Sequence, residues 1–252
     1  MRLDRFLHQT GWAKSRSEAK ELILSSFVSL NGQVVDKPAH EVDPAVPPTV
    51  TVDRTGGRYV SRGGFKLAHA LEVFSVSAAG KTCLDIGASS GGFTDCLLQH
   101  GAAMVYAVDA GSGQLAEALR GDSRVRVYEN YNARYMQPDD FPSAPSLVVM
   151  DVSFISQTYL LPRIAAVAAP SAAIVTLIKP QFELGRAHLS KKGIVRDEAA
   201  RRSAVEKVKA AAALCGFSDI RVIDSPLTGG DGNREYLMYC HNQKQPQREE
   251  QP

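Results

Sequence analysis

Four charged side chains occupy positions from which they could do acid–base chemistry. Asp151 and Lys179 each directly follow an apolar run that predicts a buried strand, and Glu235 opens the last predicted strand. Lys66 lies in a predicted helix just after a Ser-Arg-Gly-Gly turn. A lysine next to a buried strand is costly unless it is paired or functional. The carboxyl ends of parallel strands form the edge where open α/β sheets bind ligands, so these side chains are predicted to meet there.

Two lysines and two carboxylates in one pocket could take a proton from a weakly acidic hydroxyl. A partly desolvated lysine near a second cation can serve as a general base, and carboxylates can orient it. A ribose 2′-hydroxyl needs such help because it is a poor nucleophile at neutral pH. The alternative is two surface salt bridges, since the spacing implies but does not show that the four residues converge.

A glycine-rich loop, Leu84-Asp-Ile-Gly-Ala-Ser-Ser-Gly-Gly-Phe93, follows the first predicted strand of the larger block. Its G-x-x-x-G-G spacing differs from the G-x-G-x-x-G of dinucleotide sites, and Asp85 and Asp95 place negative charge nearby, which would repel a pyrophosphate. Asp109 ends the next strand, where an acidic residue can bind ribose hydroxyls. The loop therefore favours S-adenosylmethionine over NAD; the alternative is a turn that serves only packing.

Asn132 follows the third strand, where it could hydrogen-bond an adenine or simply form an Asx turn. The complete set of predicted cofactor-binding residues is Asp85, Gly87, Ser89, Gly91, Gly92, Phe93, Asp109, Asn132 and Asp151.

The composition argues against a metal-binding, secreted or membrane-spanning protein. The chain has 252 residues and a net charge of +2, and its four cysteines are scattered without a C-x-x-C pair, so no metal site is predicted. The charged N-terminus lacks the apolar core of a signal peptide. The most apolar run, Ile164–Ile178, is short and interrupted by Pro170 and Ser171, which argues against a membrane span. We expect a cytoplasmic protein without stable membrane association.

The pattern divides the chain into a small α+β domain over residues 1–53, a linker over 54–60, a large domain over 61–241 and a polar tail over 242–252. In the small domain, a helix is predicted from Leu3 and a second one after the capping box Ser15–Glu18. A hairpin is predicted around Asn31-Gly32, and a last strand at Val50–Val52.

The large domain alternates strands and helices, which predicts a largely parallel, Rossmann-like sheet covered on both faces. Its last two strands could pair antiparallel at one edge. The predicted strands are 82–86, 104–108, 125–128, 147–150, 173–178, 219–223 and 235–239, and the most regular helix is 198–215.

Basic residues crowd the first twenty positions, opposed only by Asp4 and Glu18. Such an excess could contact RNA phosphates, although a charge cluster on small helices is more often a solvated face. The predicted RNA-binding residues are Arg2, Arg5, Lys14, Arg16, Lys20 and, at the start of the large domain, Arg62.

Five ordered segments make the chain resemble the TlyA family of bacterial rRNA 2′-O-methyltransferases, which have also been called haemolysins. They are Val60–Lys66, Leu84–Thr94, Asp151–Ser156, Lys179–Glu183 and Gly232–Tyr236. The resemblance covers residues 1–240. It implies an S4-like RNA-binding domain followed by an FtsJ-type methyltransferase domain, with S-adenosylmethionine as cofactor and ribosomal RNA or ribosomal subunits as partner.

By this likeness the family's Lys-Asp-Lys-Glu tetrad falls on Lys66, Asp151, Lys179 and Glu235, with Lys179 as the base. The implied reaction methylates a cytidine 2′-hydroxyl in 16S rRNA, 23S rRNA or both, and Phe154 would pack against the cofactor or a flipped nucleotide. Two alternatives are a membrane-lytic haemolysin and an RNA-binding ribosome assembly factor without catalysis. The sequence shows no membrane-insertion segment that a lytic protein would need. A non-catalytic factor would not explain why all four positions of the tetrad carry the family's residues.

Overall fold

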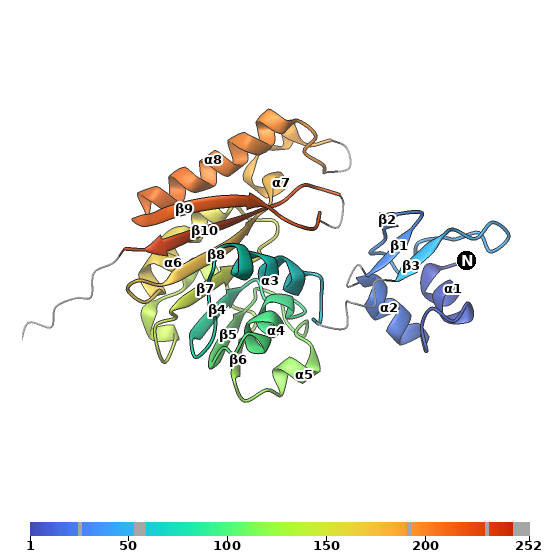
Figure 1. Ribbon diagram of the computed structural model, residues 1–252, viewed down its shortest axis with the longest axis horizontal. Helices are drawn as coiled ribbons and strands as arrows, with labels where there is room; N and C mark the ends of the chain where they lie inside the picture. Colours follow the sequence, from blue (N-terminus) through green and yellow to red (C-terminus); the bar gives the residue numbers. More distant parts are fainter. Residues whose placement is uncertain (25–26, 53–58, 191–192, 230–231, 244–252) are drawn as a thin grey trace, which may run out of the picture. The chain divides into compact units, whose positions relative to one another are not determined.

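The computed structural model describes residues 1–24, 27–52, 59–190, 193–229 and 232–243. The chain divides into two compact units, residues 1–62 and 63–252 (Figure 1). Most of the predicted linker, at residues 53–58, and most of the predicted tail, at residues 244–252, lie outside the described residues.

The first unit packs two helices against a three-stranded antiparallel sheet in the order β2-β1-β3. The predicted hairpin is confirmed: Asn31 and Gly32 both have positive φ, 49° and 77°, as a type I′ turn requires. The second helix begins at Arg16, one residue after the predicted cap Ser15, while the side chain of Glu18 lies outside the described residues. The elements are α1 (Leu3–Gln9), α2 (Arg16–Leu24), β1 (Val28–Leu30), β2 (Gln33–Val34) and β3 (Val50–Val52).

The second unit is built on a seven-stranded sheet in the order β6-β5-β4-β7-β8-β10-β9. Pairing is parallel from β6 to β8, and β10 runs antiparallel to both β8 and β9, which confirms the largely parallel α/β fold. The strands are β4 (Thr82–Ile86), β5 (Met104–Val108), β6 (Val125–Tyr128), β7 (Leu147–Met150), β8 (Ala173–Ile178), β9 (Phe217–Asp224) and β10 (Tyr236–Asn242).

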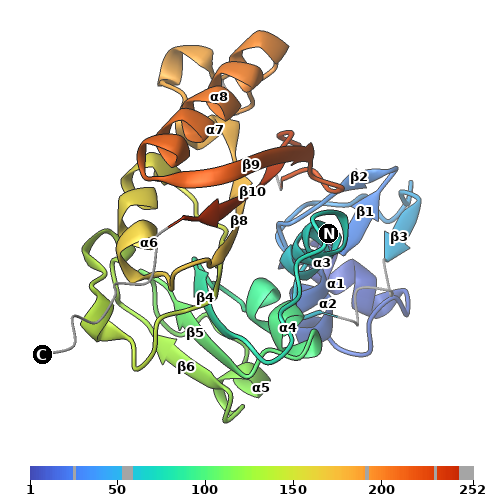
Figure 2. The same cartoon turned by 60° about the vertical axis from the view of Figure 1, so that its left-hand side comes forward.

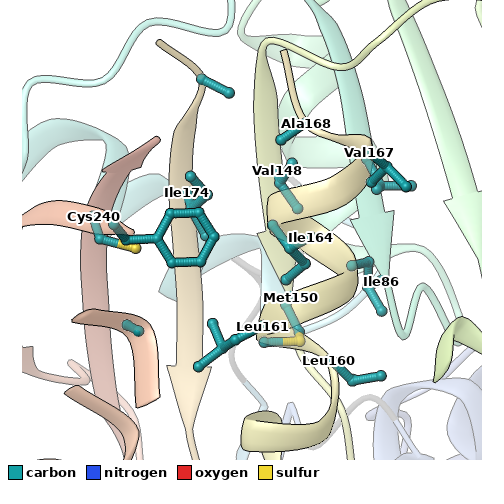
Figure 3. Close-up of a cluster of buried hydrophobic side chains, with 14 of the residues drawn as sticks. Ile86, Val148, Met150, Leu160, Leu161, Ile164, Val167, Ala168, Ile174 and Cys240 are labelled. Carbon is teal, nitrogen blue, oxygen red and sulfur yellow. The ribbon is translucent and has the colours of Figure 1, made fainter. Parts of the chain in front are cut away.

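Helices cover both faces of this sheet (Figure 2). On one face, α6 and α8 pack on the strands, and Leu161 and Ile164 of α6 lie over Val148 and Ile174 in the buried cluster (Figure 3). On the other face lie α3 and α4, which contact each other. The helices are α3 (Gly63–Val73), α4 (Gly92–Gln99), α5 (Glu117–Arg120), α6 (Leu161–Val167), α7 (Pro180–Glu183) and α8 (Glu198–Leu214), with short 3-10 turns η2 (Ala133–Tyr135), η3 (Pro138–Asp140), η4 (Gln157–Tyr159) and η5 (Arg186–His188).

The strand order reverses between β4 and β7. The chain runs outward from β4 through β5 to β6 and then returns to place β7 on the other side of β4. Such a reversal opens a crevice beyond the carboxyl ends of the two strands, where doubly wound sheets bind ligands. The residues that follow β4 and β7 therefore define where a site can form.

Candidate active site

Gly87 lets the segments after β4 and β7 approach each other closely. Its φ is +85°, and a Cβ built there would collide with the carbonyl oxygen of Asp151. A glycine is required here for both reasons, because other residues rarely adopt this φ and have no space for a side chain. The close approach places Asp151 directly beside the glycine loop.

A cavity of about 390 Å³ opens at this crevice. Five of the predicted cofactor-binding residues line it: Gly87, Ser89, Asp109, Asn132 and Asp151. Among its described lining residues, the charged ones are the carboxylates Asp109 and Asp151, and its walls include apolar side chains such as Ile155 and Leu160. An acidic, partly apolar cavity suits a cationic ligand with an aromatic base and disfavours a pyrophosphate.

Asp109 is held in place by the backbone around it. Its Oδ2 accepts a hydrogen bond from the amide of Ser89 at 2.8 Å, and its Oδ1 accepts one from the amide of Gly111 at 2.7 Å. Asn132 both lines the cavity and forms the Asx turn, since its side-chain oxygen accepts from the amide of Arg134 at 3.0 Å. The two predicted roles of Asn132 are therefore compatible, because its Nδ2 group is not needed for the turn.

Four predicted cofactor residues lie outside the cavity lining: Asp85, Gly91, Gly92 and Phe93. Side chains alternate along β4, so Asp85 points to the sheet face covered by α4 instead of toward the crevice. There it is fully buried and accepts a 2.6 Å hydrogen bond from Thr94. A Cβ at Gly91 would run into Leu119, so this glycine permits close packing next to α5. Phe93 is buried in α4.

Burial raises the pKa of Asp85 to about 7, with the nearby carboxylates of Asp151 and Asp109 acting in the same direction and the Thr94 hydrogen bond opposing it. The folded protein thus holds a proton that the unfolded chain releases near pH 4. This contribution to stability is full below pH 4 and is lost as the pH rises through about 7.

Asp85→Asn should therefore flatten the pH dependence of the free energy of unfolding by about 4 kcal/mol between pH 4 and 8. Urea unfolding followed by circular dichroism at several pH values measures the effect. Asp95→Asn, on the next helix, is the matched control and should keep the wild-type profile. A wild-type profile in Asp85→Asn would show that this carboxyl ionises as easily in the folded protein as in the unfolded chain.

The four predicted catalytic residues form two ion pairs at the same edge of the sheet. Lys179 Nζ lies 2.6 Å from Asp151 Oδ1 and donates to Ser153 Oγ at 3.0 Å. Lys66 Nζ lies 2.5 Å from Glu235 Oε2, and both side chains are almost completely buried. Tyr236 pairs with Ile178 across the antiparallel strands β10 and β8. Lys179, which follows the end of β8, and Glu235, which precedes the start of β10, therefore lie at the same edge of the sheet.

A buried carboxylate fixes the loop between Asp151 and η4. Glu183 of α7 accepts hydrogen bonds from Ser156 Oγ at 2.5 Å and from the amide of Gln157 at 2.8 Å. Lys207 of α8 lies 3.7 Å from the same carboxylate and donates to the Glu183 carbonyl at 2.6 Å. The loop that carries Asp151 is thus tied to the helix that directly follows Lys179.

Phe154, in the same loop, is an exposed aromatic residue at the mouth of the cavity. Its side chain is 91% exposed, and its φ of +65° is uncommon for a residue other than glycine. Its ring contacts that of Phe182, with centroids 5.0 Å apart. An apolar ring held out in this way is available to a planar ligand group.

The basic residues predicted to bind RNA lie in the first unit. Arg5 on α1 and Lys20 on α2 are exposed, as is Lys14 between the two helices, and Arg62 is half-buried at the end of the unit. Arg2 and Arg16 are also exposed, and both contact the carboxylate of Asp4.

Sequence reasoning missed three residues that organise these sites. Ser153 and Glu183 lie within the quoted segments Asp151–Ser156 and Lys179–Glu183, but nothing in their spacing indicated that the two segments bond to each other. In the sequence, Asp4 is visible only as a negative charge among the basic residues. Within the described ranges, no group of His, Cys, Asp and Glu is arranged to hold a metal ion. The same ranges include no helix with the length and apolarity needed to cross a bilayer.

The chain is similar to known proteins over both of its units. Residues 59–242 match the FtsJ-like methyltransferase family, and residues 1–45 match the S4 domain. The 16S/23S rRNA (cytidine-2′-O)-methyltransferase TlyA of Mycobacterium tuberculosis is 43% identical over 242 residues, covering 96% of this chain and 90% of that protein. Hemolysin A of Brachyspira hyodysenteriae is 43% identical over 240 residues, covering 95% and 99%. A solved Streptococcus thermophilus structure that carries the hemolysin label superposes with a TM-score of 0.77 at 41% identity, covering 99% of this chain and 91% of that one.

The sheet order, the acidic crevice at its reversal and the FtsJ-like match define a methyltransferase that uses S-adenosylmethionine. With an S4 domain preceding it, the chain belongs to the TlyA family. The hemolysin name that some relatives carry is a historical label in this family.

Proposed function

We propose that this protein transfers the methyl group of S-adenosylmethionine to a cytidine ribose 2′-hydroxyl in ribosomal RNA of the small subunit, the large subunit or both. The observation that carries the proposal is the pair of ion pairs, Lys179–Asp151 and Lys66–Glu235, beside an acidic cavity at one sheet edge. The M. tuberculosis relative, named for this reaction, supports it.

The residues lining the cavity suit S-adenosylmethionine. Bound there, this cofactor supplies an electrophilic methyl group on a positively charged sulfur. Asp109 would accept hydrogen bonds from its ribose hydroxyls, and Asn132, with the neighbouring apolar wall, would hold its adenine. Asp151 would place a negative charge near the cationic end of the ligand.

Asp109→Ala should weaken cofactor binding by about 10- to 100-fold, because two hydrogen bonds to a charged acceptor would be lost. Isothermal titration with S-adenosylhomocysteine measures the change. Asp139→Ala, an exposed carboxylate outside the cavity lining, is the control and should bind as wild type does. Unchanged affinity in Asp109→Ala would remove this residue from the cofactor site.

Lys179 is assigned as the base in this proposal. Its amine nitrogen accepts the 2′-hydroxyl proton while the ribose oxygen gains the methyl group, and the proton then passes to solvent. Asp151 and Ser153 hold this nitrogen at the sheet edge. The buried pair Lys66–Glu235 lies at the same edge of the sheet and completes the proposed tetrad. Phe154 offers an exposed ring on which a cytosine flipped out of its stack can rest.

In this proposal the S4 domain binds folded rRNA by contacting its phosphates and recognising the shape of the RNA. Arg5, Lys14 and Lys20 present exposed positive charge on its helices and the turn between them, and Arg2, Arg16 and Arg62 complete the proposed contacts. With such a partner, we expect the protein to act in the cytoplasm on ribosomal subunits.

Incubation of the purified protein with methyl-labelled S-adenosylmethionine and purified 30S and 50S subunits tests the proposal. We expect label in rRNA and, after digestion to nucleosides, in 2′-O-methylcytidine. Binding to subunits without incorporation would instead identify a non-catalytic assembly factor. Leakage of dye from liposomes by lipid-free protein, with no incorporation into rRNA, would favour a lytic protein.

A further inference from the structure

Asp4 is a buried carboxylate in the most basic segment of the chain. Its side chain is only 5% exposed, and it accepts two hydrogen bonds from Arg2, through Nε at 3.0 Å and Nη2 at 3.2 Å. Arg16 Nη2 donates to Oδ2 at 2.9 Å, and the amide of Arg5 donates to Oδ1 at 2.9 Å. One carboxylate therefore organises side chains from α2 and from the residue preceding α1.

The two guanidinium groups lie side by side because Arg2 and Arg16 both donate to the same oxygen, Oδ2 of Asp4. Their side chains are 52% and 56% exposed, so both are accessible to solvent while Asp4 is buried. Two cations held this close repel each other unless an anion lies between them. The cluster as a whole still carries a net positive charge.

Asp4 remains ionised under all ordinary conditions. The hydrogen bond from Arg2 lowers its pKa to about 2, with Arg16 and the amide of Arg5 acting in the same direction against burial. The carboxylate thus acts as a fixed anchor. The contacts with Asp4 therefore fix the orientation of two guanidinium groups whose side chains are more than half exposed.

We propose that Asp4 is a positioning residue that holds Arg2 and Arg16 as one preorganised double fork for the backbone phosphates of RNA. This inference rests on the proposed function, and it names the residue that arranges the RNA-binding face of the S4 domain. Planar guanidinium forks match phosphate oxygens in a way that mobile lysines do not, and fixing them in advance reduces the entropy lost on binding.

The proposal predicts that removing the charge of Asp4 changes RNA affinity in the opposite direction from that expected from net charge alone. Asp4→Asn makes the protein more positive, which alone should strengthen RNA binding; we instead expect affinity for a labelled RNA stem–loop to fall about tenfold at 0.1 M salt. The slope of log affinity against log salt should decrease by about 1–2, as two phosphate contacts are lost. Glu41→Gln is the control. Glu41 is exposed, and its backbone forms a β-bridge with that of Arg2, so this variant removes one nearby negative charge without touching the Asp4 cluster. It should bind RNA equally or more tightly.

Amide hydrogen exchange in α1 shows whether Asp4→Asn disturbs the fold of the S4 domain. If it does, two further variants still test the proposal. Arg2→Lys and Arg16→Lys preserve both the charge and Asp4, yet each should weaken binding about three- to fivefold, because lysine cannot form the fork. Wild-type affinity in Asp4→Asn with α1 intact, or in both lysine variants, overturns the inference alone. Wild-type protein that binds neither the stem–loop nor ribosomal subunits overturns the proposed function.

Discussion

Lys179→Ala should lower methyl transfer to ribosomal subunits by about 1,000-fold or more, the range expected when a general base is lost. Affinity for S-adenosylhomocysteine should stay within about twofold, because Lys179 does not line the cofactor cavity. The physical reason is the position of its nitrogen, 2.6 Å from Asp151 and 3.0 Å from Ser153 at the edge where the hydroxyl must arrive. Single-turnover methyl transfer and calorimetric titration measure the two quantities separately.

Lys179→Arg distinguishes proton transfer from charge alone. Arginine keeps the positive charge beside Asp151 but does not release its proton in proteins, so this variant should be nearly as inactive as Lys179→Ala. Lys209→Ala, which removes a partly exposed lysine of α8 paired with Glu206, is the control and should retain wild-type activity. A Lys179→Arg protein with more than about a tenth of wild-type activity would reassign the residue to electrostatic stabilisation.

Glu235→Ala should destabilise the protein strongly, costing about 3–5 kcal/mol in the free energy of unfolding. Its carboxylate is 2% exposed and is the 2.5 Å partner of Lys66, which is itself 9% exposed. Removal of one member leaves the other charge buried without compensation. Urea unfolding of the full chain at pH 7 measures the loss.

The double variant Lys66→Met, Glu235→Leu separates stability from catalysis. Apolar side chains of similar volume replace both charges, so most of the lost stability should return. Methyl transfer should stay low, because the buried ion pair that completes the proposed tetrad would be gone. Full activity in the stable double variant would show that the pair only fills the core, and a double variant as unstable as Glu235→Ala would contradict the account of buried charge.

Strands, helices and the sheet edge were predictable because their signals are local. Apolar runs between turns predicted β4 to β8 within the observed bounds, and alternation with helices predicted a parallel sheet. The antiparallel pairing of the last two strands was also foreseen, whereas the position of β10 between β8 and β9 was not. Strand order depends on contacts between distant segments, which spacing along one chain does not encode.

Side-chain direction limited the prediction of the site. In the sequence, Asp85 and Asp109 both lie near the carboxyl end of a predicted strand. Because side chains alternate along β4, Asp85 points to the buried face covered by α4. Asp109 follows the end of β5 and lines the cavity. The same limit hid Glu183, whose partners Ser156 and Gln157 are 27 and 26 residues away in the chain. The basic cluster was visible, but the buried carboxylate that arranges Arg2 and Arg16 required the fold.

Reverse-transcription mapping of 2′-O-methyl groups in rRNA, with and without this protein, tests the central claim most directly. Stops at low nucleotide concentration locate each modified ribose in 16S and 23S rRNA from matched cells. The account predicts at least one cytidine whose 2′-O-methylation is present with the wild-type protein and absent both without it and with Lys179→Ala. Identical maps in all three cases would contradict it.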